Sequence, residues 1–291
     1  MTDAQSRPWR SVLYIPGSKT RALDKARGLA VDAIIFDLED AVAPSEKGAA
    51  RETLAGELRA GGYGRRAGLV RVNALDTDWG GDDVAALGAL APDAVLLPKV
   101  NGAADVAALA ERLDAAGAPD TAIWAMMETP EGVLNAAGIA RAPRMAGFVL
   151  GTNDLAKDLR CRPGGDRMPL MTALQTCLLA ARAAGIVCVD GVYNAFKDAE
   201  GLEAECVQGR DLGMDGKTLI HPAQVEVANR VFAPDPAALD LARRQIDAFA
   251  EAEAAGQGVA VVDGQIVENL HIVTARALLA RADAIAALET Q

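Results

Sequence analysis

The chain has 291 residues, of which 51% are apolar, and its 29 basic residues stand against 40 acidic ones for a formal charge of −11. The apolar content is enough for a large buried core and argues against intrinsic disorder. The net negative charge argues against a nucleic-acid or anionic-membrane surface. A small molecule or another protein is therefore the expected partner.

Cysteine usage and the N-terminal sequence bear on the compartment. The four cysteines show no CxxC spacing, and the two histidines form no zinc-type cluster with them, so neither disulfides nor structural zinc are expected. The N-terminal MTDAQSRPWRS lacks the apolar core of a signal peptide, and no apolar run approaches the ~18 residues of a membrane span. We expect a cytoplasmic protein.

Eight short β-branched runs recur along the chain. They are Ser11–Ile15, Asp32–Asp37, Leu69–Asn73, Ala94–Pro98, Ala122–Glu128, Gly147–Gly151, Ile186–Asp190 and Gly216–Ile220. Between them lie stretches with apolar residues at helical spacing, such as Arg21–Ala30, Val106–Ala115 and Met171–Ala184. The alternation predicts parallel strands and crossover helices, and eight units predict a (β/α)8 TIM barrel. The alternative is an open doubly wound sheet, although GxGxxG and P-loop motifs are missing.

The pattern changes after residue 233, which predicts a barrel domain over residues 1–233 and a small appendage over 234–291. Apolar residues at helical spacing from Leu239 to Phe249 indicate an amphipathic helix. Two apolar runs then flank Asp263-Gly264, a pair suited to a tight hairpin, and a helix follows from about Ile272 to Leu288. This helix-hairpin-helix segment is predicted to be a lid or an oligomerisation arm.

Polar residues stand at the ends of many predicted strands, and the carboxyl ends of barrel strands carry the active site. These residues are Asp37-Leu38-Glu39-Asp40, Arg71-Val72-Asn73, Lys99, Glu128, Asp154 and Asp190. Carboxylates gathered at one mouth repel each other unless a cation or proton compensates. Mg²⁺ takes oxygen ligands, commonly one or two carboxylates together with water and substrate.

Glu128 and Asp154 follow adjacent predicted strands and are the predicted metal pair. The alternative is that both are helix caps, Asp154 for a helix near Leu155 and Glu128 for one entered at Pro130. Glu39 and Asp40 could support the ligands from outside, or could be ordinary surface charges.

Three further residues have competing interpretations. Arg71 offers a two-pronged donor suited to a substrate carboxylate, and the alternative is a structural ion pair with a neighbouring acid. Lys99 is either a site residue or a solvated charge. His221 is predicted to be a packed structural residue.

The chain resembles the citrate lyase β-subunit-like family of the HpcH/HpaI aldolase superfamily, which includes malyl-CoA and citramalyl-CoA lyases. The matching segments run from Arg10 to Gln224, and they are RSVLYIPGSKTRALDKA, IIFDLEDAVAPSEK, VRVNALDTDWG, LLPKV, METPEGVLNA, GTNDLAKDL, VDGVY and GMDGKTLIHPAQ. The resemblance implies a Mg²⁺-dependent lyase on a (β/α)8 barrel, usually a homotrimer, that cleaves a C–C bond in a 3-hydroxyacyl thioester.

The resemblance also implies roles for individual residues. Glu128 of METPEG and Asp154 of GTNDL become the metal ligands, Arg71 grips the carboxylate of the 2-keto acid, and Glu39 and Asp40 order metal-bound waters. The backbone at Gly151, Thr152 and Asn153 would donate hydrogen bonds to the keto acid. Family members that use CoA bind it near the start of the barrel, where the basic residues are Lys19, Arg21, Lys25 and Arg27. Those four residues can equally form a solvated helix face.

The lid departs from the family pattern. The related lyases carry an aspartate in a motif like GxMID, on a lid that reaches a neighbouring subunit's site. This chain has Glu268 at that place, in GQIVE. Glu268 could perform the same proton transfer with one more methylene of reach, but a displaced catalytic group can lower the rate by orders of magnitude.

The main hypothesis is therefore a Mg²⁺-dependent lyase that splits a malyl-, citramalyl- or citryl-type thioester into a 2-keto acid and an acyl thioester. One alternative is a citrate lyase β subunit acting on an acyl carrier protein thioester. A malyl-CoA thioesterase, which needs the same metal, is another. The last is a non-catalytic acyl-CoA-binding paralogue with a degenerate lid.

Overall fold

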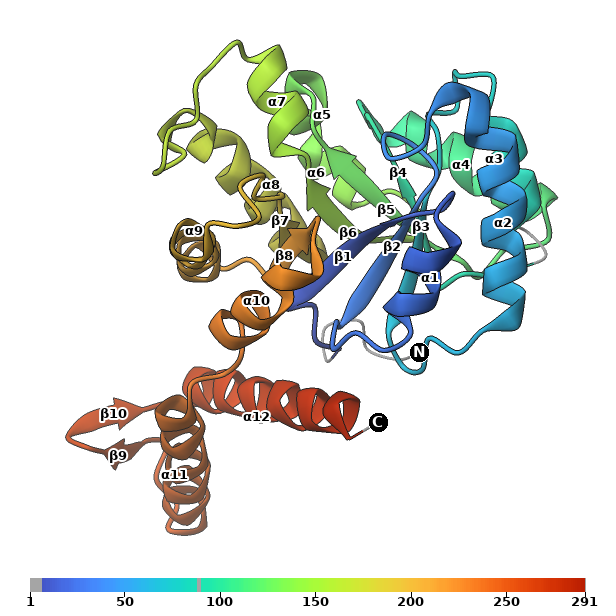
Figure 1. Ribbon diagram of the computed structural model, residues 1–291. Coiled ribbons are helices and arrows are strands. Elements are labelled where there is room, and N and C mark those ends of the chain that lie inside the picture. The colour runs from blue at the N-terminus through green and yellow to red at the C-terminus, as the bar shows by residue number, and fades with distance from the viewer. Residues whose placement is uncertain (1–6, 88–89, 291) are drawn as a thin grey trace. The chain divides into compact units, whose positions relative to one another are not determined.

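A closed barrel of eight parallel strands forms the larger part of the protein (Figure 1). The structure is a computed structural model, and it describes residues 7–87 and 90–290. The strands follow one another in chain order, and β8 pairs with β1 to close the barrel. They are β1 (Ser11–Pro16), β2 (Ala33–Asp37), β3 (Ala67–Arg71), β4 (Ala94–Leu97), β5 (Ala122–Met127), β6 (Met145–Leu150), β7 (Val187–Asp190) and β8 (Gly216–Leu219). The predicted (β/α)8 barrel is confirmed. Residues 1–6, part of the segment predicted to lack a signal peptide, lie outside the described ranges.

Helices follow the strands along the chain. They are α1 (Thr20–Ala26), α2 (Lys47–Ala60), α3 (Gly80–Leu87), α4 (Ala103–Ala115), α5 (Pro130–Leu134), α6 (Ala136–Ala140), α7 (Thr152–Asp158), α8 (Met171–Ala184), α9 (Ala199–Leu212) and α10 (Val225–Val231), with 3-10 turns η1 (Pro44–Glu46), η2 (Met168–Leu170) and η3 (Pro222–Gln224). α8 has the predicted bounds. α1 ends four residues before its predicted end, just ahead of Gly28, a poor helix former. Among the described helices, none is long and apolar enough to cross a membrane.

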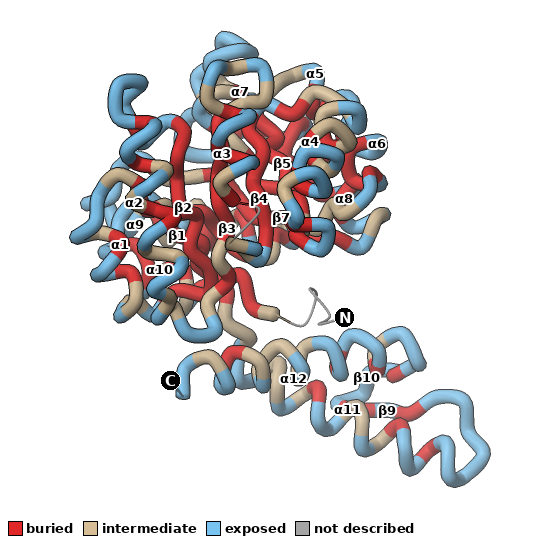
Figure 2. Tube along the Cα trace, turned by 90° about the vertical axis from the view of Figure 1, so that its right-hand side faces the viewer, coloured by how far each residue is buried: buried red, intermediate tan, exposed pale blue. Residues whose placement is uncertain are grey.

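Alternation along the strands divides the barrel core into two layers. Ala33 and Ile35 of β2 belong to a cluster built almost wholly from strand residues, which fills the barrel interior. Ile34 and Phe36 point the other way, into a larger cluster shared with the surrounding helices. Because both faces are covered, the strands read as continuous apolar runs and appear mostly buried in Figure 2.

The register of the strands sets the mouth of the barrel. Asp37, the last residue of β2, pairs with Arg71, the last residue of β3. On the other side Asp37 pairs with Pro16 at the end of β1. All strands are parallel, so their carboxyl ends and the residues just beyond them meet at one end of the barrel.

Contacts within the chain separate the barrel, Trp9–Phe232, from a second unit that includes the C-terminal segment from Ala233. That segment holds α11 (Pro236–Ala254), the antiparallel strands β9 (Ala260–Val262) and β10 (Gln265–Val267), and α12 (Asn269–Glu289). Asp263 and Gly264 join the strands with φ of 50° and 76°, as a two-residue type I′ turn requires. The predicted helix, hairpin and helix are confirmed, although α12 begins three residues early, with Glu268 at its N-cap.

Candidate active site

A cavity of about 350 Å³ is lined by residues from the carboxyl ends of the strands. The predicted site residues that line it are Asp40, Arg71, Glu128, Gly151, Thr152, Asn153 and Asp154. They come from the ends of β2, β3, β5 and β6, so the fold brings together side chains that are more than 100 residues apart. Glu268 belongs to the C-terminal unit, and its role stays a prediction.

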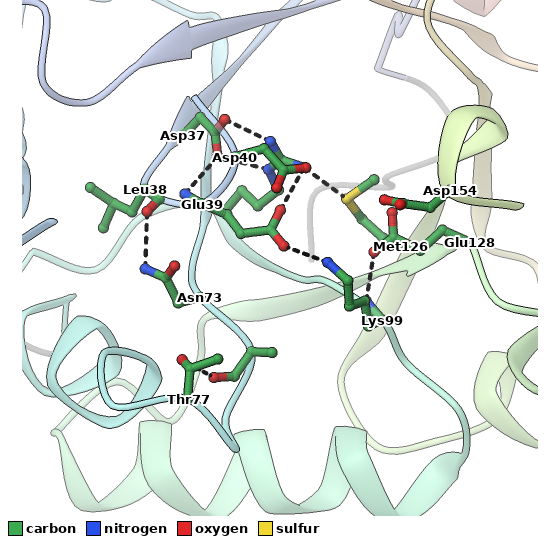
Figure 3. Close-up of polar contacts among 12 residues, drawn as sticks. Asp37, Leu38, Glu39, Asp40, Asn73, Thr77, Lys99, Met126, Glu128 and Asp154 are labelled. Atoms are coloured by element: carbon green, nitrogen blue, oxygen red, sulfur yellow. Dashed lines mark hydrogen bonds and ion pairs between the residues drawn. The ribbon is translucent and has the colours of Figure 1, made fainter. Parts of the chain in front are cut away.

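Glu128 lies directly after β5 and is only 2% exposed. Its Oε1 accepts a hydrogen bond of 2.7 Å from the backbone N–H of Lys99, which adopts a left-handed φ of 52°. Burial, together with the negative charges of Glu39 and Asp154, raises the pKa of Glu128 to about 7. Burial is the largest cause, so the ionised carboxylate of Glu128 is poorly stabilised in the free protein. Figure 3 shows its side chain beside that of Asp154.

Gly151 gives Glu128 its room. A Cβ at position 151 would collide with the Glu128 side chain, so the end of β6 passes closer to this carboxylate than any other residue would allow. Asp154 follows three residues later, in the first turn of α7, with its side chain 31% exposed. The two predicted ligands are thus one buried and one half-buried carboxylate on adjacent strand ends.

The capping alternative for these two carboxylates is wrong. The N-cap of α5 is Thr129, whose side chain accepts a hydrogen bond from the Gly132 N–H. The N-cap of α7 is Gly151, and no side chain caps that helix. Neither Glu128 nor Asp154 occupies a cap position, so helix capping does not explain their presence.

Arg71 is buried, makes ion pairs with neighbouring acids and also lines the cavity. Its Nε and Nη2 donate to the two oxygens of Asp37 at 2.7 and 2.6 Å. Its Nη1 lies 2.8 Å from Glu39 Oε2 and 3.6 Å from Asp40 Oδ2, and its guanidinium lies 4.9 Å from the centre of the Tyr14 ring. The sequence offered an ion pair as the alternative to ligand binding; in the structure Arg71 makes ion pairs and lines the cavity.

Glu39, Asp40 and Lys99 differ in their surroundings. Glu39 is 7% exposed, and its Oε1 accepts a 2.9 Å hydrogen bond from Lys99 Nζ, so it links Lys99 with Arg71. Asp40 has a side chain that is 65% exposed and lines the cavity. Lys99 is not merely a solvated charge, because both its backbone N–H and its ammonium group contact acids of the site.

Tyr14 and Asn194 are among the cavity residues that the sequence did not single out. Tyr14 lies on β1 beneath Arg71, and burial raises its pKa. Asn194 lies on the loop after β7 and exchanges two hydrogen bonds with the side chain of Asn153, at 2.8 and 3.2 Å. Tyr14 could have been found from the sequence, because it lies two residues after Val12 and therefore on the same, inward face of β1. No local pattern marks Asn194, which lies in a loop.

Two other residues that the sequence singled out, Asp190 and His221, make structural contacts. Asp190 does not line the cavity: burial opposes its ionisation, but Lys217 and Arg167 hold its pKa below the usual range. His221 has the structural role that was predicted, although it is exposed and not buried: its Nδ1 accepts a hydrogen bond from the Ala223 N–H at the start of η3, and its ring stacks on Phe196. Asp190 is held by Arg167 and Lys217, and His221 is held by its contacts with Ala223 and Phe196.

The candidate basic patch at the start of the barrel is smaller than the sequence indicated. Lys19, Arg21 and Lys25 are exposed. Arg27 is instead half-buried, where it donates 2.6 Å to Glu57 and lies over the ring of Tyr63. Three lysine and arginine side chains remain available there for an anionic ligand.

The two carboxylates at the cavity, Glu128 and Asp154, fit Mg²⁺, which takes part of its ligands from water and substrate. They do not fit a metal ion whose ligands all come from protein side chains. In the described ranges no cluster of three or more His, Cys, Asp or Glu side chains is arranged to hold a metal ion. Two carboxylates that leave further positions to water and substrate are the donor set that Mg²⁺ commonly takes. Burial and nearby carboxylates raise the pKa of Glu128, which means that its ionised form is unfavourable in the free protein. A bound cation would stabilise that ionised form.

Comparison with known proteins decides the family. Residues 10–222 match the family model described as HpcH/HpaI aldolase/citrate lyase. The chain belongs to this family. Membership confirms the resemblance inferred from the strand-end motifs, and the match covers all eight barrel strands.

Individual members of the HpcH/HpaI family differ in their named activity. The chain is 63% identical over 97% of its length to a (3S)-malyl-CoA thioesterase of Cereibacter sphaeroides, 98% of which is covered. It is 35% identical over 97% of its length to the citrate lyase subunit β of Escherichia coli, 96% of which is covered. The similarity to a thioesterase leaves lyase activity a prediction.

A solved structure extends the similarity to the fold. CitE of Mycobacterium tuberculosis, in complex with magnesium, acetoacetate and coenzyme A, is 30% identical with a TM-score of 0.77. The match covers 96% of this chain and 99% of that one. The chain is therefore similar to this family member over nearly its full length.

Proposed function

We propose that this protein is a Mg²⁺-dependent hydrolase of a malyl-CoA-type thioester, which releases malate and CoA. The observation that carries the proposal is the cavity itself, which places a carboxylate-binding guanidinium, Arg71, in one space with the carboxylate pair Glu128 and Asp154. A malyl thioester presents a free carboxylate, a hydroxyl and a thioester carbonyl to these groups. The 63% identity to a (3S)-malyl-CoA thioesterase supports this reaction over the others.

Glu128 and Asp154 would hold Mg²⁺, as the magnesium complex of CitE supports. The bound ion would polarise a substrate oxygen and activate water. The protein's own residues bind and orient the substrate. Arg71 would pair with the free carboxylate, and Asp37 holds the guanidinium in the required plane through two hydrogen bonds.

The other predicted residues would assist these. Gly151, Thr152 and Asn153 line the cavity beside the metal pair and would contact the acid end of the substrate. Glu39 fixes Arg71 and Lys99, while Asp40 faces the cavity and would orient water. The CoA portion would bind near Lys19, Arg21 and Lys25, as exposed cations suit its phosphates.

Product analysis tests the proposal. The purified chain with Mg²⁺ and malyl-CoA should yield malate and free CoA in equal amounts. In ¹⁸O-labelled water, one ¹⁸O should appear in the new malate carboxylate, because water attacks the thioester carbon. Formation of glyoxylate and acetyl-CoA without malate would contradict hydrolysis, and no turnover at all would favour a non-catalytic acyl-CoA-binding protein.

A lyase is the second candidate, favoured by the family model and by the citrate lyase β subunits among the relatives. Cleavage of the C–C bond would give a 2-keto acid and an acyl thioester at the same metal and Arg71. If the chain acted as a citrate lyase β subunit, it would need the thioester on an acyl carrier protein. Activity on free CoA thioesters separates the two. A homotrimer stays a prediction.

Glu268 is proposed to transfer a proton to or from the substrate, from the lid of a neighbouring subunit. It is the N-cap residue of α12, and its backbone N–H donates 3.0 Å to His271 Nδ1, so its backbone is fixed at a helix start. We expect Glu268→Gln to lower kcat about 10²-fold, because general acid–base catalysis typically contributes that much or more. Steady-state kinetics measure this. Gln265→Glu, on the same hairpin, is the control and should leave kcat unchanged.

A further inference from the structure

A buried ionic cluster holds the start of the loop after β7. Lys217 on β8 is fully buried, and its Nζ donates to Asp190 Oδ2, Glu205 Oε1 and the backbone oxygen of Gly191, at 3.1, 2.6 and 2.6 Å. Arg167 adds two hydrogen bonds to Asp190 at 2.8 and 2.9 Å. Asp190 in turn accepts from the Gly191 N–H at 2.8 Å. Both backbone polar groups of Gly191 are therefore fixed from beneath.

The rest of this loop is held as firmly. The backbone oxygen of Tyr193 accepts 2.9 Å from Gln224, a fully buried side chain, and the Tyr193 hydroxyl donates 2.6 Å to Asp198. The Phe196 N–H donates 2.9 Å to the Asn194 carbonyl. Asn194 thus projects from a loop whose backbone is anchored on both sides, which is the support that a precisely placed functional side chain needs.

The Asn194 carboxamide lines the cavity that contains Arg71 and Glu128. Its Nδ2 donates to Asn153 Oδ1 at 2.8 Å, and its Oδ1 accepts from Asn153 Nδ2 at 3.2 Å. Across the described residues, the bond to Asn153 is the one that the structure gives this Nδ2 group, so its second hydrogen is available to a ligand. Asn194 is a neutral donor held at a cavity wall.

We propose that Asn194 is a catalytic residue that donates its second Nδ2–H to the thioester carbonyl oxygen of the substrate. The inference rests on the proposed function, since it assumes that a malyl thioester occupies this cavity. Arg71 is occupied by the free carboxylate in that complex, so the thioester oxygen requires a separate donor. The paired amides of Asn194 and Asn153 supply it without adding charge.

The chemistry requires such a donor in either reaction. In hydrolysis the water oxygen adds to the thioester carbon, the carbonyl π electrons move onto oxygen, and the resulting oxyanion collapses with loss of the C–S bond. The thiolate of CoA takes one proton, and the second proton of water leaves with formation of the malate carboxylate. In C–C cleavage the same oxygen carries the charge of the enolate. A preorganised N–H at that oxygen stabilises charge that is absent in the ground state.

The test compares Asn194→Ala and Asn194→Asp with the wild-type protein in the presence of Mg²⁺ and malyl-CoA. Aspartate keeps the shape of the side chain and an acceptor for Asn153 Nδ2, but it has no hydrogen to donate, either to Asn153 Oδ1 or to the substrate. We expect both variants to lose about 10²-fold in kcat, the usual effect of removing an oxyanion donor. Inhibition by free CoA, which lacks the thioester carbonyl, should be unchanged. Asn135→Ala is the control, because Asn135 is exposed and does not line the cavity.

Three outcomes would overturn the inference. They are a kcat for Asn194→Ala within threefold of wild type, full activity of Asn194→Asp, and an equal loss in Asn135→Ala. Thermal unfolding midpoints equal to wild type are expected, since Asn194 is an exposed loop residue. A wild-type protein without turnover would remove both this inference and the proposed function. An active wild type with an equally active Asn194→Ala variant would remove this inference alone.

Discussion

Glu128→Gln is expected to abolish turnover and yet stabilise the metal-free protein at alkaline pH. Loss of a direct metal ligand should lower kcat/KM by more than about 10²-fold, because even the outer partners of ligands contribute 10–100-fold. The buried carboxylate has a pKa raised to about 7. An acid whose pKa is raised on folding destabilises the fold as it ionises, so stability falls as the pH rises from about 4.5 to 7.

The size of that cost follows from the shift itself. A carboxyl group raised to about 7 loses on the order of 3 kcal/mol of folding stability once ionised, and glutamine does not ionise. Thermal unfolding in EDTA should therefore show a higher midpoint for Glu128→Gln at pH 8 and little difference at pH 5. Glutamine can still accept the Lys99 N–H, so the site geometry is retained.

Glu131→Gln is the matched control for this experiment. Glu131 lies on α5, three residues from Glu128, but it is exposed, so its substitution should change neither activity nor the pH profile of unfolding. A lower midpoint for Glu128→Gln at pH 8 would show that the carboxylate is not strained in the free site. Undiminished activity of that variant would end its assignment as a metal ligand.

The barrel and the position of the cavity at its mouth were predictable for a simple physical reason. Parallel strands covered on both faces are continuous apolar runs, and their carboxyl ends must meet at one mouth. The polar residue after each run therefore predicts a site without knowledge of any contact. Arg71, Glu128 and Asp154 were found in this way.

Which strand-end acids belong to the site was not predictable from local sequence. Asp37 and Asp190 both end an apolar strand, in IIFD and VCVD. Asp37 binds Arg71 at the cavity wall, while Asp190 is taken up by Arg167 and Lys217, which lie 23 and 27 residues away in the chain. The difference comes from long-range partners. Asn194 was not predicted for the same reason, because only its hydrogen bonds with the distant Asn153 indicate that it belongs to the cavity.

Arg71→Lys is expected to lower kcat/KM for malyl-CoA by about 10²- to 10³-fold while the protein still folds. Lysine retains the positive charge between Asp37 and Glu39, so neither buried carboxylate is left without a cation. An ammonium group is a point charge, however, and cannot engage Asp37 through two parallel hydrogen bonds and also present a donor to the substrate. The loss of affinity should be confined to ligands that carry a free carboxylate. Inhibition by malate should weaken, and inhibition by free CoA should not.

Arg10→Lys is the matched control at the opposite end of the barrel. Arg10 is 3% exposed and donates to both oxygens of the buried Asp32, at 3.0 and 2.9 Å, just as Arg71 does to Asp37. Both substitutions should cost similar stability, because each replaces a buried two-point ion pair, yet only Arg71→Lys should change malate inhibition. If malate binds Arg71→Lys and wild type equally well, Arg71 acts only as a structural partner of Asp37, and the substrate carboxylate must be bound elsewhere.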